Sequence, residues 1–325
     1  MKLARLADWQ TGLVLPDGHI VDVPASLRQL EQSAAYVSNT DVELFSAVDW
    51  SPLIKNWTTA KDTLTALAEI ATRDLSAVVS RPAAETVLRP PITSPTATIF
   101  AAGANFADHA AAAKSLILKK EITEEEVRAE KDAGLPPWGF IVLPRSISGP
   151  GAVVSPPAST TMFDYEAEVA ITLRSGGRDL QPADLDAWGF TAWNDLSIRD
   201  HIFGRGTAVD RGILVWALSK NFDTGNACGP WMVVDEGHDV HRLEMSTRVN
   251  GTVRQKSSTA NMIYSFGDIL AHISAYVTLR PGDMFTSGTP AGATIESGAD
   301  GAYLRPGDEV EINIGDAAIL KNTVG

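Results

Sequence analysis

The stretch DYEAEVAITL, residues 164–173, is the most informative segment for the fold of this chain. It alternates like a β-strand, in which successive side chains point to opposite faces of a sheet. Glu166 and Glu168 therefore share one face with Ala170 and Thr172. Because the surrounding residues are apolar, we expect this carboxylate-bearing face not to be open surface.

Two neighbouring carboxylates in a partly buried place repel each other, and each loses favourable hydration on leaving water. A hard divalent cation relieves both problems because it prefers oxygen ligands. The spacing alone fits equally well the polar, exposed face of an edge strand. Asp195 raises the case for a metal site because it ends a predicted strand at residues 189–193, although it could also cap a helix. Three carboxylates without a Cys or His favour Mg²⁺ or Mn²⁺ over zinc.

Three further side chains near these motifs are candidates for chemistry. Arg199 and Lys220 could bind a substrate carboxylate or steady an oxyanion, and either could equally form a structural ion pair. His109 lies in a loop that joins an apolar strand, residues 97–102, to a helix. Loops at such strand ends commonly hold functional residues.

The composition limits the partners of this chain. Its 325 residues are 44% apolar and 21% charged, with a formal net charge of −13. That charge repels nucleic acid and anionic membranes, so we expect neither as a partner. The one cysteine, Cys228, excludes an intrachain disulfide. We find no signal peptide and no apolar run near the roughly 18 residues of a membrane helix, and we expect a cytoplasmic protein.

The organisation of the chain indicates a mainly β protein with some helix, of the α+β class. Residues 1–90 read as a small N-terminal domain with an Asp17-Gly18 hairpin and a helix near residues 58–75, and proline-rich residues 88–95 mark its end. Residues 91–325 form the second domain, where residues 111–137 are helical and charged and are either a solvated helical pair or a lid. We expect further strands at residues 229–234, 246–249, 283–287 and 309–314, and a helix at 265–276.

A series of short motifs follows the same order and spacing as in one known family. They are GANFADH (103–109), DYEAEVA (164–170), GFTAWNDLSIRD (189–200), KNFD (220–223), GPW (229–231), VNG (249–251), LRPGD (279–283) and SGTPAG (287–292). On these motifs, the chain from about residue 98 to its end resembles the fumarylacetoacetate hydrolase family. The resemblance implies a mixed β-sandwich or β-roll catalytic domain, usually in a homodimer.

The resemblance also implies a site. One Mg²⁺ or Mn²⁺ per subunit would be bound by Glu166, Glu168 and Asp195, and a 2-keto acid substrate would chelate it. A histidine matching His109 activates water, and the residue matching Lys220 helps to polarise an oxygen. Thr289 matches a substrate-contacting threonine of the family, and we also expect Arg199, which follows Asp195 closely, to bind the substrate.

Two departures from the family pattern bear on the reaction. Many members carry a glutamate three residues after the histidine, where this chain has Ala112. A carboxylate such as Glu121 or Glu124 could orient His109 instead. Members also often carry a lysine in place of Val142, and the segment between His109 and residue 140 is longer than usual.

Three functions therefore stay open. The first is a metal-dependent hydrolase that cleaves a carbon–carbon bond of a 2,4-diketo acid resembling an acylpyruvate. The second is a lyase or isomerase of the same family, which would dehydrate, decarboxylate or tautomerise a 2-keto acid with less need of a water-activating base. The third is a non-catalytic protein that keeps the site for structure or for binding a ligand.

Overall fold

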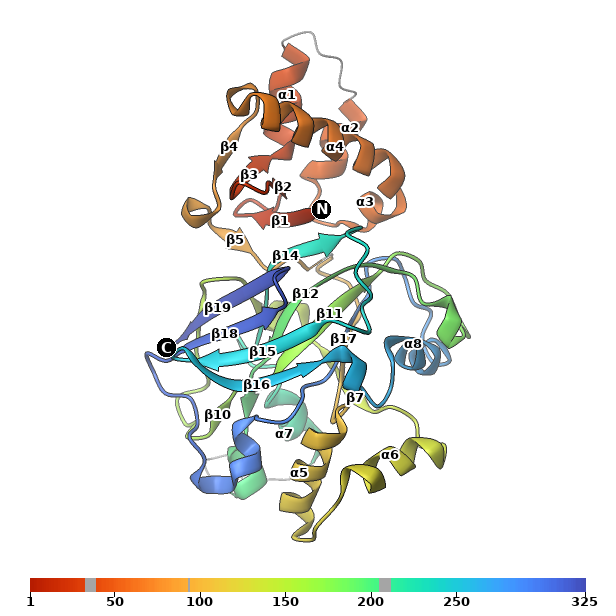
Figure 1. The fold of residues 1–325 in the computed structure, drawn as a ribbon, viewed down its shortest axis with the longest axis vertical. Coiled ribbons are helices and arrows are strands. Elements are labelled where there is room, and N and C mark those ends of the chain that lie inside the picture. Colours follow the sequence, from red (N-terminus) through yellow and green to blue (C-terminus); the bar gives the residue numbers. More distant parts are fainter. Residues whose placement is uncertain (33–38, 93, 205–211) are drawn as a thin grey trace.

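The computed structural model describes residues 1–32, 39–92, 94–204 and 212–325. Within the predicted linker at 88–95, residue 93 lies outside this description. In the described ranges two large sheets dominate, with helices at the ends of the molecule (Figure 1). The prediction of an α+β, mainly β protein is confirmed. None of the helices in the described part of the chain has the length and apolar character that a bilayer crossing requires.

The larger sheet contains 12 of the described strands, from β1 near the N-terminus to β17, in the order β4-β3-β2-β1-β14-β12-β11-β17-β6-β7, with β5 beside β1 and β8 beside β14. Its strands are β1 (Lys2–Leu6), β2 (Thr11–Val14), β3 (His19–Asp22), β4 (Ser80–Pro82), β5 (Leu88–Arg89), β6 (Ile99–Ala102), β7 (Gly139–Val142), β8 (Ile147–Ser148), β11 (Ala167–Leu173), β12 (Ala187–Asp195), β14 (Asn226–Val234) and β17 (Met284–Thr286).

The second sheet packs across the centre of the first. It contains β16 (Thr252–Ser258), β15 (Glu244–Val249), β18 (Glu309–Ile314), β19 (Ala318–Val324) and β9 (Val153–Val154), in that order. A short pair, β10 (Phe163–Asp164) with β13 (Ser197–Ile198), lies beside the site described below. The apolar side chains of Val169, Ile171 and Leu173 on β11 point into the core between the two sheets, together with Val310 and Ile312 of β18.

β11 is an interior strand rather than an edge strand. It pairs with β12 on one side and with β17 on the other, and all its residues are buried. Ala170 packs into a second core on the opposite face from Val169 and Ile171. The alternation predicted for this segment is therefore present, and the alternative of an exposed edge strand is wrong.

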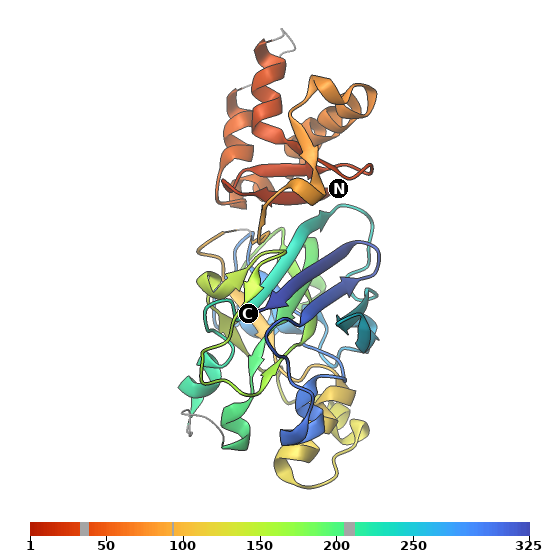
Figure 2. The same cartoon turned by 90° about the vertical axis from the view of Figure 1, so that its left-hand side faces the viewer.

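The N-terminal residues join the larger sheet directly. β1 pairs with β14, and the second core unites apolar side chains of α1 (Val23–Gln32), α3 (Ser51–Lys55) and α4 (Trp57–Arg73) with Trp188 and Trp193 of β12. These helices, with α2 (Asn39–Ser46), cap one end of the molecule (Figures 1 and 2). The division into domains at residues 90 and 91 stays a prediction, because sheet and core both continue across it.

The opposite end of the molecule carries α5 (Ala107–Leu118), α6 (Glu124–Asp132) and α7 (Ile213–Leu218), while α8 (Phe266–Ser274) lies along one side (Figure 1). Thr123 caps α6 with a reciprocal bond to Glu126, and Lys131 bonds the Asp268 carboxylate of α8 at 2.8 Å. The helical pair predicted for this segment is present. That residues 111–137 act as a lid over the site stays a prediction.

Candidate active site

The carboxylates of β11 and β12 meet because the two strands pair in register. Ala167 lies opposite Asn194, and the Asp195 amide donates to the Glu166 carbonyl at 2.9 Å. This pairing places Asp195 beside the start of β11, where Glu166 and Glu168 project. One oxygen from each of the three carboxylates lies within 4.8 Å of the others, and all three residues are buried.

Two buried cations contact this group. The Lys220 ammonium lies 2.5 Å from Glu166 Oε2 and 2.7 Å from Asp195 Oδ2. The Arg199 guanidinium bonds Glu166 Oε1 through Nη2 and Asp164 Oδ2 through Nε, the latter at 3.1 Å. Both cations predicted from the sequence therefore reach the carboxylates, and both form ion pairs there.

Negative charge is in excess at this place. Four buried carboxylates, those of Asp164, Glu166, Glu168 and Asp195, stand against the two cations. Glu168 Oε2 and Asp195 Oδ1 are buried and accept no hydrogen bond from the described residues. Buried acceptors without partners are strongly unfavourable. The donor set therefore fits a hard divalent cation, which would bind both oxygens and balance the two surplus charges.

The pKa values of the three carboxyls report the same imbalance. Burial and the neighbouring Asp195 raise the pKa of Glu168 well above its usual range. Burial also raises the pKa of Asp195 to about 7, although Lys220 opposes the rise. Burial alone would raise the pKa of Glu166 as well, but Arg199 and Lys220 hold it well below its usual range. A bound dication would favour the ionised form of all three.

His109 stands beside this group with a carboxylate of its own. Its Nδ1 lies 2.7 Å from Glu296 Oε1, and its Nε2 lies 4.0 Å from Glu166 Oε1. Glu296 is held in turn by the Gly292 amide, which donates to Oε2 at 3.0 Å. A hydrogen bond of this kind fixes the orientation and tautomer of an imidazole. In a neutral imidazole it leaves the Nε2 lone pair free to accept a proton.

The sequence does not single out Glu296. The suggestion that Glu121 or Glu124 orients His109 is wrong, because Glu296 bonds the ring. Glu121 lies between α5 and α6, Glu124 begins α6, and both are exposed. Glu296 belongs to the helical turn at Thr294–Asp300, which follows the SGTPAG motif, residues 287–292. A carboxylate four residues beyond a glycine-rich motif was the available signal, but only the fold brings it 187 residues back to His109.

Thr289 is fixed by a buried glutamine. Gln255 Nε2 donates to Thr289 Oγ1 and to the Pro290 carbonyl, each at 2.8 Å, while Gln255 Oε1 accepts from the Ala167 amide at 3.0 Å. The threonine is thereby tied to the start of β11. Asp164 makes a similar link, because its Oδ1 and Oδ2 accept from the amides of Thr294 and Ile295 beside Glu296.

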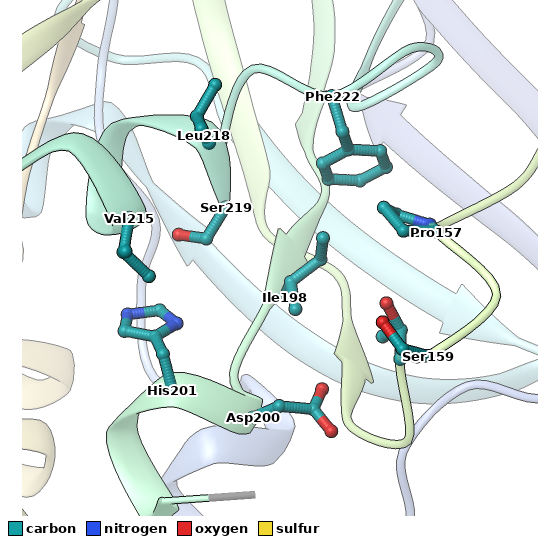
Figure 3. A pocket seen from close by; sticks show the side chains of 10 residues that line it. Pro157, Ser159, Ile198, Asp200, His201, Val215, Leu218, Ser219 and Phe222 are labelled. Atoms are coloured by element: carbon teal, nitrogen blue, oxygen red, sulfur yellow. The ribbon is translucent and has the colours of Figure 1, made fainter. Parts of the chain in front are cut away.

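One cavity of about 150 Å³ brings the predicted residues together. Its lining includes His109, Glu166, Glu168, Asp195, Arg199, Lys220 and Thr289. Their individual roles stay predictions. A larger cavity of about 370 Å³ is lined by Val215 and Leu218 of α7 and by Ile198 and Phe222 among others (Figure 3). Its carboxylate, Asp200, accepts hydrogen bonds from the amides of Thr161 and Met162.

Known proteins are similar to this chain in sequence. The family model described as fumarylacetoacetate (FAA) hydrolase C-terminal matches residues 98–325. The mitochondrial oxaloacetate tautomerase Fahd2a of Rattus norvegicus is 33% identical over 247 residues, which are 75% of this chain and 71% of that protein.

Solved structures show the same fold. The 2-hydroxyhepta-2,4-diene-1,7-dioate isomerase from Mycobacterium marinum is 29% identical, with a TM-score of 0.57 over 76% of this chain and 80% of that one. Maleylpyruvate hydrolase from Sphingobium sp. SYK-6, in complex with manganese(II) and pyruvate, has a TM-score of 0.66 over 100% of this chain and 98% of that one, and at 23% identity this likeness shows the fold alone. With its motifs, its fold and the match over residues 98–325, the chain belongs to the fumarylacetoacetate hydrolase family.

Proposed function

We propose that this protein is a divalent-metal-dependent hydrolase that cleaves a carbon–carbon bond of a 2,4-diketo acid. The observation that carries this proposal is the His109–Glu296 pair beside three buried carboxylates. The pair supplies the oriented base that hydrolysis needs. The sequence left this base in question, because Ala112 stands where many family members have the glutamate that orients the histidine.

Glu166, Glu168 and Asp195 would hold Mg²⁺ or Mn²⁺. When bound, such an ion supplies positive charge that polarises the 2-oxo group and the adjacent carboxylate of the substrate. The manganese and pyruvate in the Sphingobium maleylpyruvate hydrolase support this assignment at the level of a shared fold. Arg199 and Lys220 hold Glu166 and Asp195 in place and add positive charge where the substrate anion would lie.

His109 takes a proton from water in the proposed reaction, and the water oxygen bonds to C4 of the substrate. The C3–C4 bond then breaks, and its electron pair stays on C3. His109 returns the proton to C3, so the products are a carboxylic acid and a 2-oxo acid. Glu296 holds the ring throughout and stabilises the imidazolium that forms. Thr289, oriented by Gln255, is proposed to contact the substrate.

A second candidate is tautomerisation of a 2-oxo acid, and the named activity of the rat relative favours it. This reaction moves a proton between C3 and an oxygen and requires no attacking water. The same His109–Glu296 pair could carry the proton. Assembly as a homodimer and a cytoplasmic location also stay predictions.

Isotope transfer separates the two candidates. We expect 2,4-dioxopentanoate in H₂¹⁸O with Mg²⁺ to yield acetate carrying ¹⁸O, with turnover lost on chelation and restored by Mg²⁺. His109→Ala should lower this turnover at least about 100-fold, the usual contribution of a positioned base. His272→Ala, on α8, serves as the matched control. Unlabelled acetate, no cleavage, or full activity of the His109 variant would contradict the hydrolase. Faster decay of the enol of oxaloacetate without cleavage would favour the tautomerase.

A further inference from the structure

The cavity that holds the proposed site changes character between its floor and its mouth. Its charged residues, from Glu166 to Lys220, are at most 6% exposed. Ile117 and Trp138, by contrast, are more than half exposed and mark the mouth. The wall between floor and mouth is apolar and is built from Ile117, Trp138, Phe140, Ile202, Trp216 and Ile295.

An aromatic path connects the two ends of the cavity. The Lys220 ammonium lies 5.6 Å from the centre of the Phe140 ring. That ring meets Trp216 edge-on at 5.0 Å, and Trp216 lies 5.7 Å from Trp138. Trp138 packs against Gly103, where a Cβ atom would come within 2.7 Å of the indole. The three rings therefore offer continuous apolar contact to a substrate group that extends from the floor to the mouth of the cavity.

The cations among the described residues that line this cavity are already paired. Lys220 and Arg199 bind the carboxylates of the floor. Lys114, nearer the mouth, lies 2.6 and 2.5 Å from the two carboxylate oxygens of Glu130. A second carboxylate on a substrate would have to displace one of these partners or lie unpaired against tryptophan, which is unfavourable.

We propose that the substrate is a 2-oxo acid with an uncharged, apolar tail, which extends from the floor along Phe140 and Trp216 towards Trp138. This inference rests on the proposed function for its head group. It selects monocarboxylates over substrates with a second, distal carboxylate. Trp138, Trp216 and Ile202 are then the residues that determine specificity.

Calorimetric binding of unreactive 2-oxo acids in the presence of Mg²⁺ tests the inference without turnover. The probes are pyruvate, 2-oxohexanoate and 2-oxohexanedioate, of which the last two differ only in a terminal methyl or carboxylate. We expect 2-oxohexanoate to bind more tightly than pyruvate, by about fourfold for each methylene that is buried. We expect it to bind at least about tenfold more tightly than 2-oxohexanedioate.

The outcomes distinguish the two proposals. Pyruvate binding together with equal or tighter binding of the diacid would overturn the apolar tail and leave the proposed function intact. Failure of pyruvate to bind would overturn both. Tight, selective binding of 2-oxohexanoate would support both.

Two variants locate the effect. Trp138→Ala should weaken 2-oxohexanoate about tenfold and leave pyruvate unchanged, while Tyr276→Ala, an exposed aromatic outside the cavity, should change neither. Ile202→Lys should shift the preference towards 2-oxohexanedioate, whereas the uncharged Ile202→Met should not. An unaltered preference in both Trp138→Ala and Ile202→Lys, with pyruvate still bound, would overturn the inference.

Discussion

Two buried arginines, one in each half of the molecule, show what distinguishes a site from a core. Arg5 of β1 donates to the carbonyls of Trp9, Ala47 and Val48, at 2.8, 2.8 and 2.6 Å. Its guanidinium carbon lies 3.9 Å from the centre of the Trp50 ring. Burial lowers the pKa of Arg5 to about 9, although Asp49 opposes this. Arg5 joins backbone segments of the N-terminal region, which is a structural task.

Arg199 is also buried but lies among carboxylates. Burial alone would lower the pKa of Arg199, yet Glu166 and Asp164 outweigh it and raise the pKa above its usual value. The chain supplies three carbonyl acceptors to Arg5. Near Arg199, by contrast, Glu168 Oε2 and Asp195 Oδ1 accept no hydrogen bond from the residues that the structure describes. A buried charge is therefore weak evidence of function, while an unbalanced group of buried charges points to a missing ligand.

We expect the largest effect when one of the buried carboxylates is removed. Glu168→Gln should weaken Mn²⁺ binding at least about 100-fold, because it removes a charged ligand rather than an outer contact. The metal-free variant should be no less stable than the parent, since repulsion with Asp195 is relieved. Calorimetry and thermal unfolding measure these effects, and Glu244→Gln, at an exposed position of β15, is the control. Unchanged Mn²⁺ affinity would show that Glu168 is not a ligand.

Replacing Arg5 in the N-terminal region should lower stability and leave Mn²⁺ binding unchanged. Arg5→Met leaves the carbonyls of Trp9, Ala47 and Val48 without this donor and should lower the free energy of unfolding by about 3 kcal/mol. Arg5→Lys keeps the charge but not the planar fork, so its free energy of unfolding should lie between those of the parent and of Arg5→Met. Urea unfolding measures the loss, and Mn²⁺ affinity should stay within about twofold. A large fall in Mn²⁺ affinity with little loss of stability would remove the distinction drawn between the arginines.

Glu296→Gln tests the part of the site that the sequence analysis missed. Glutamine can still bond the His109 ring but carries no charge to stabilise an imidazolium. We expect kcat for carbon–carbon cleavage to fall about 10- to 100-fold with Mn²⁺ affinity unchanged. Asp300→Asn, an exposed carboxyl in the same helical turn, is the control. Full activity of the Glu296 variant would show that His109 needs no carboxylate partner.

The smallest effect lies where the two regions meet. Asp235, at the end of β14, accepts from Lys61 at 2.7 Å and from Trp57 at 3.0 Å, and these bonds lower the pKa of Asp235 to about 2. A lowered pKa means that the stabilisation is present above the unfolded value near 3.8 and is lost as the pH falls through about 2.

Asp235→Asn should therefore lower the free energy of unfolding at pH 7 by no more than about 1 kcal/mol, because the pair is partly exposed. The difference between parent and variant should shrink at pH 3, as measured by urea unfolding. Asp62→Asn is the control, because Asp62 is exposed on α4, the helix of Trp57 and Lys61, and lies outside this contact. A difference that grows as the pH falls would contradict the assigned role of Asp235.

The local pattern was sufficient for the strands and the family. Alternation in residues 164–173 predicted β11, the Asp17-Gly18 turn predicted the hairpin of β2 and β3, and the motifs from residue 103 onward indicated the fold. These features depend on neighbours in sequence, which the sequence displays directly. The boundary at residue 90 could not be settled in this way, because β1 bonds β14 more than 200 residues later.

By itself, the sequence determined that Glu166 and Glu168 share a face of one strand, that Asp195 ends another, and that the chain resembles a metal-dependent family. Only the tertiary structure decided that Glu296 orients His109, that Asp164 and Arg199 join the carboxylates, and that apolar side chains line the way out. The physical reason is that alternation is a property of a few consecutive residues. An unbalanced buried charge, a hydrogen-bonded pair and a cavity wall are instead assembled from distant segments, and their pairing depends on how the whole chain packs.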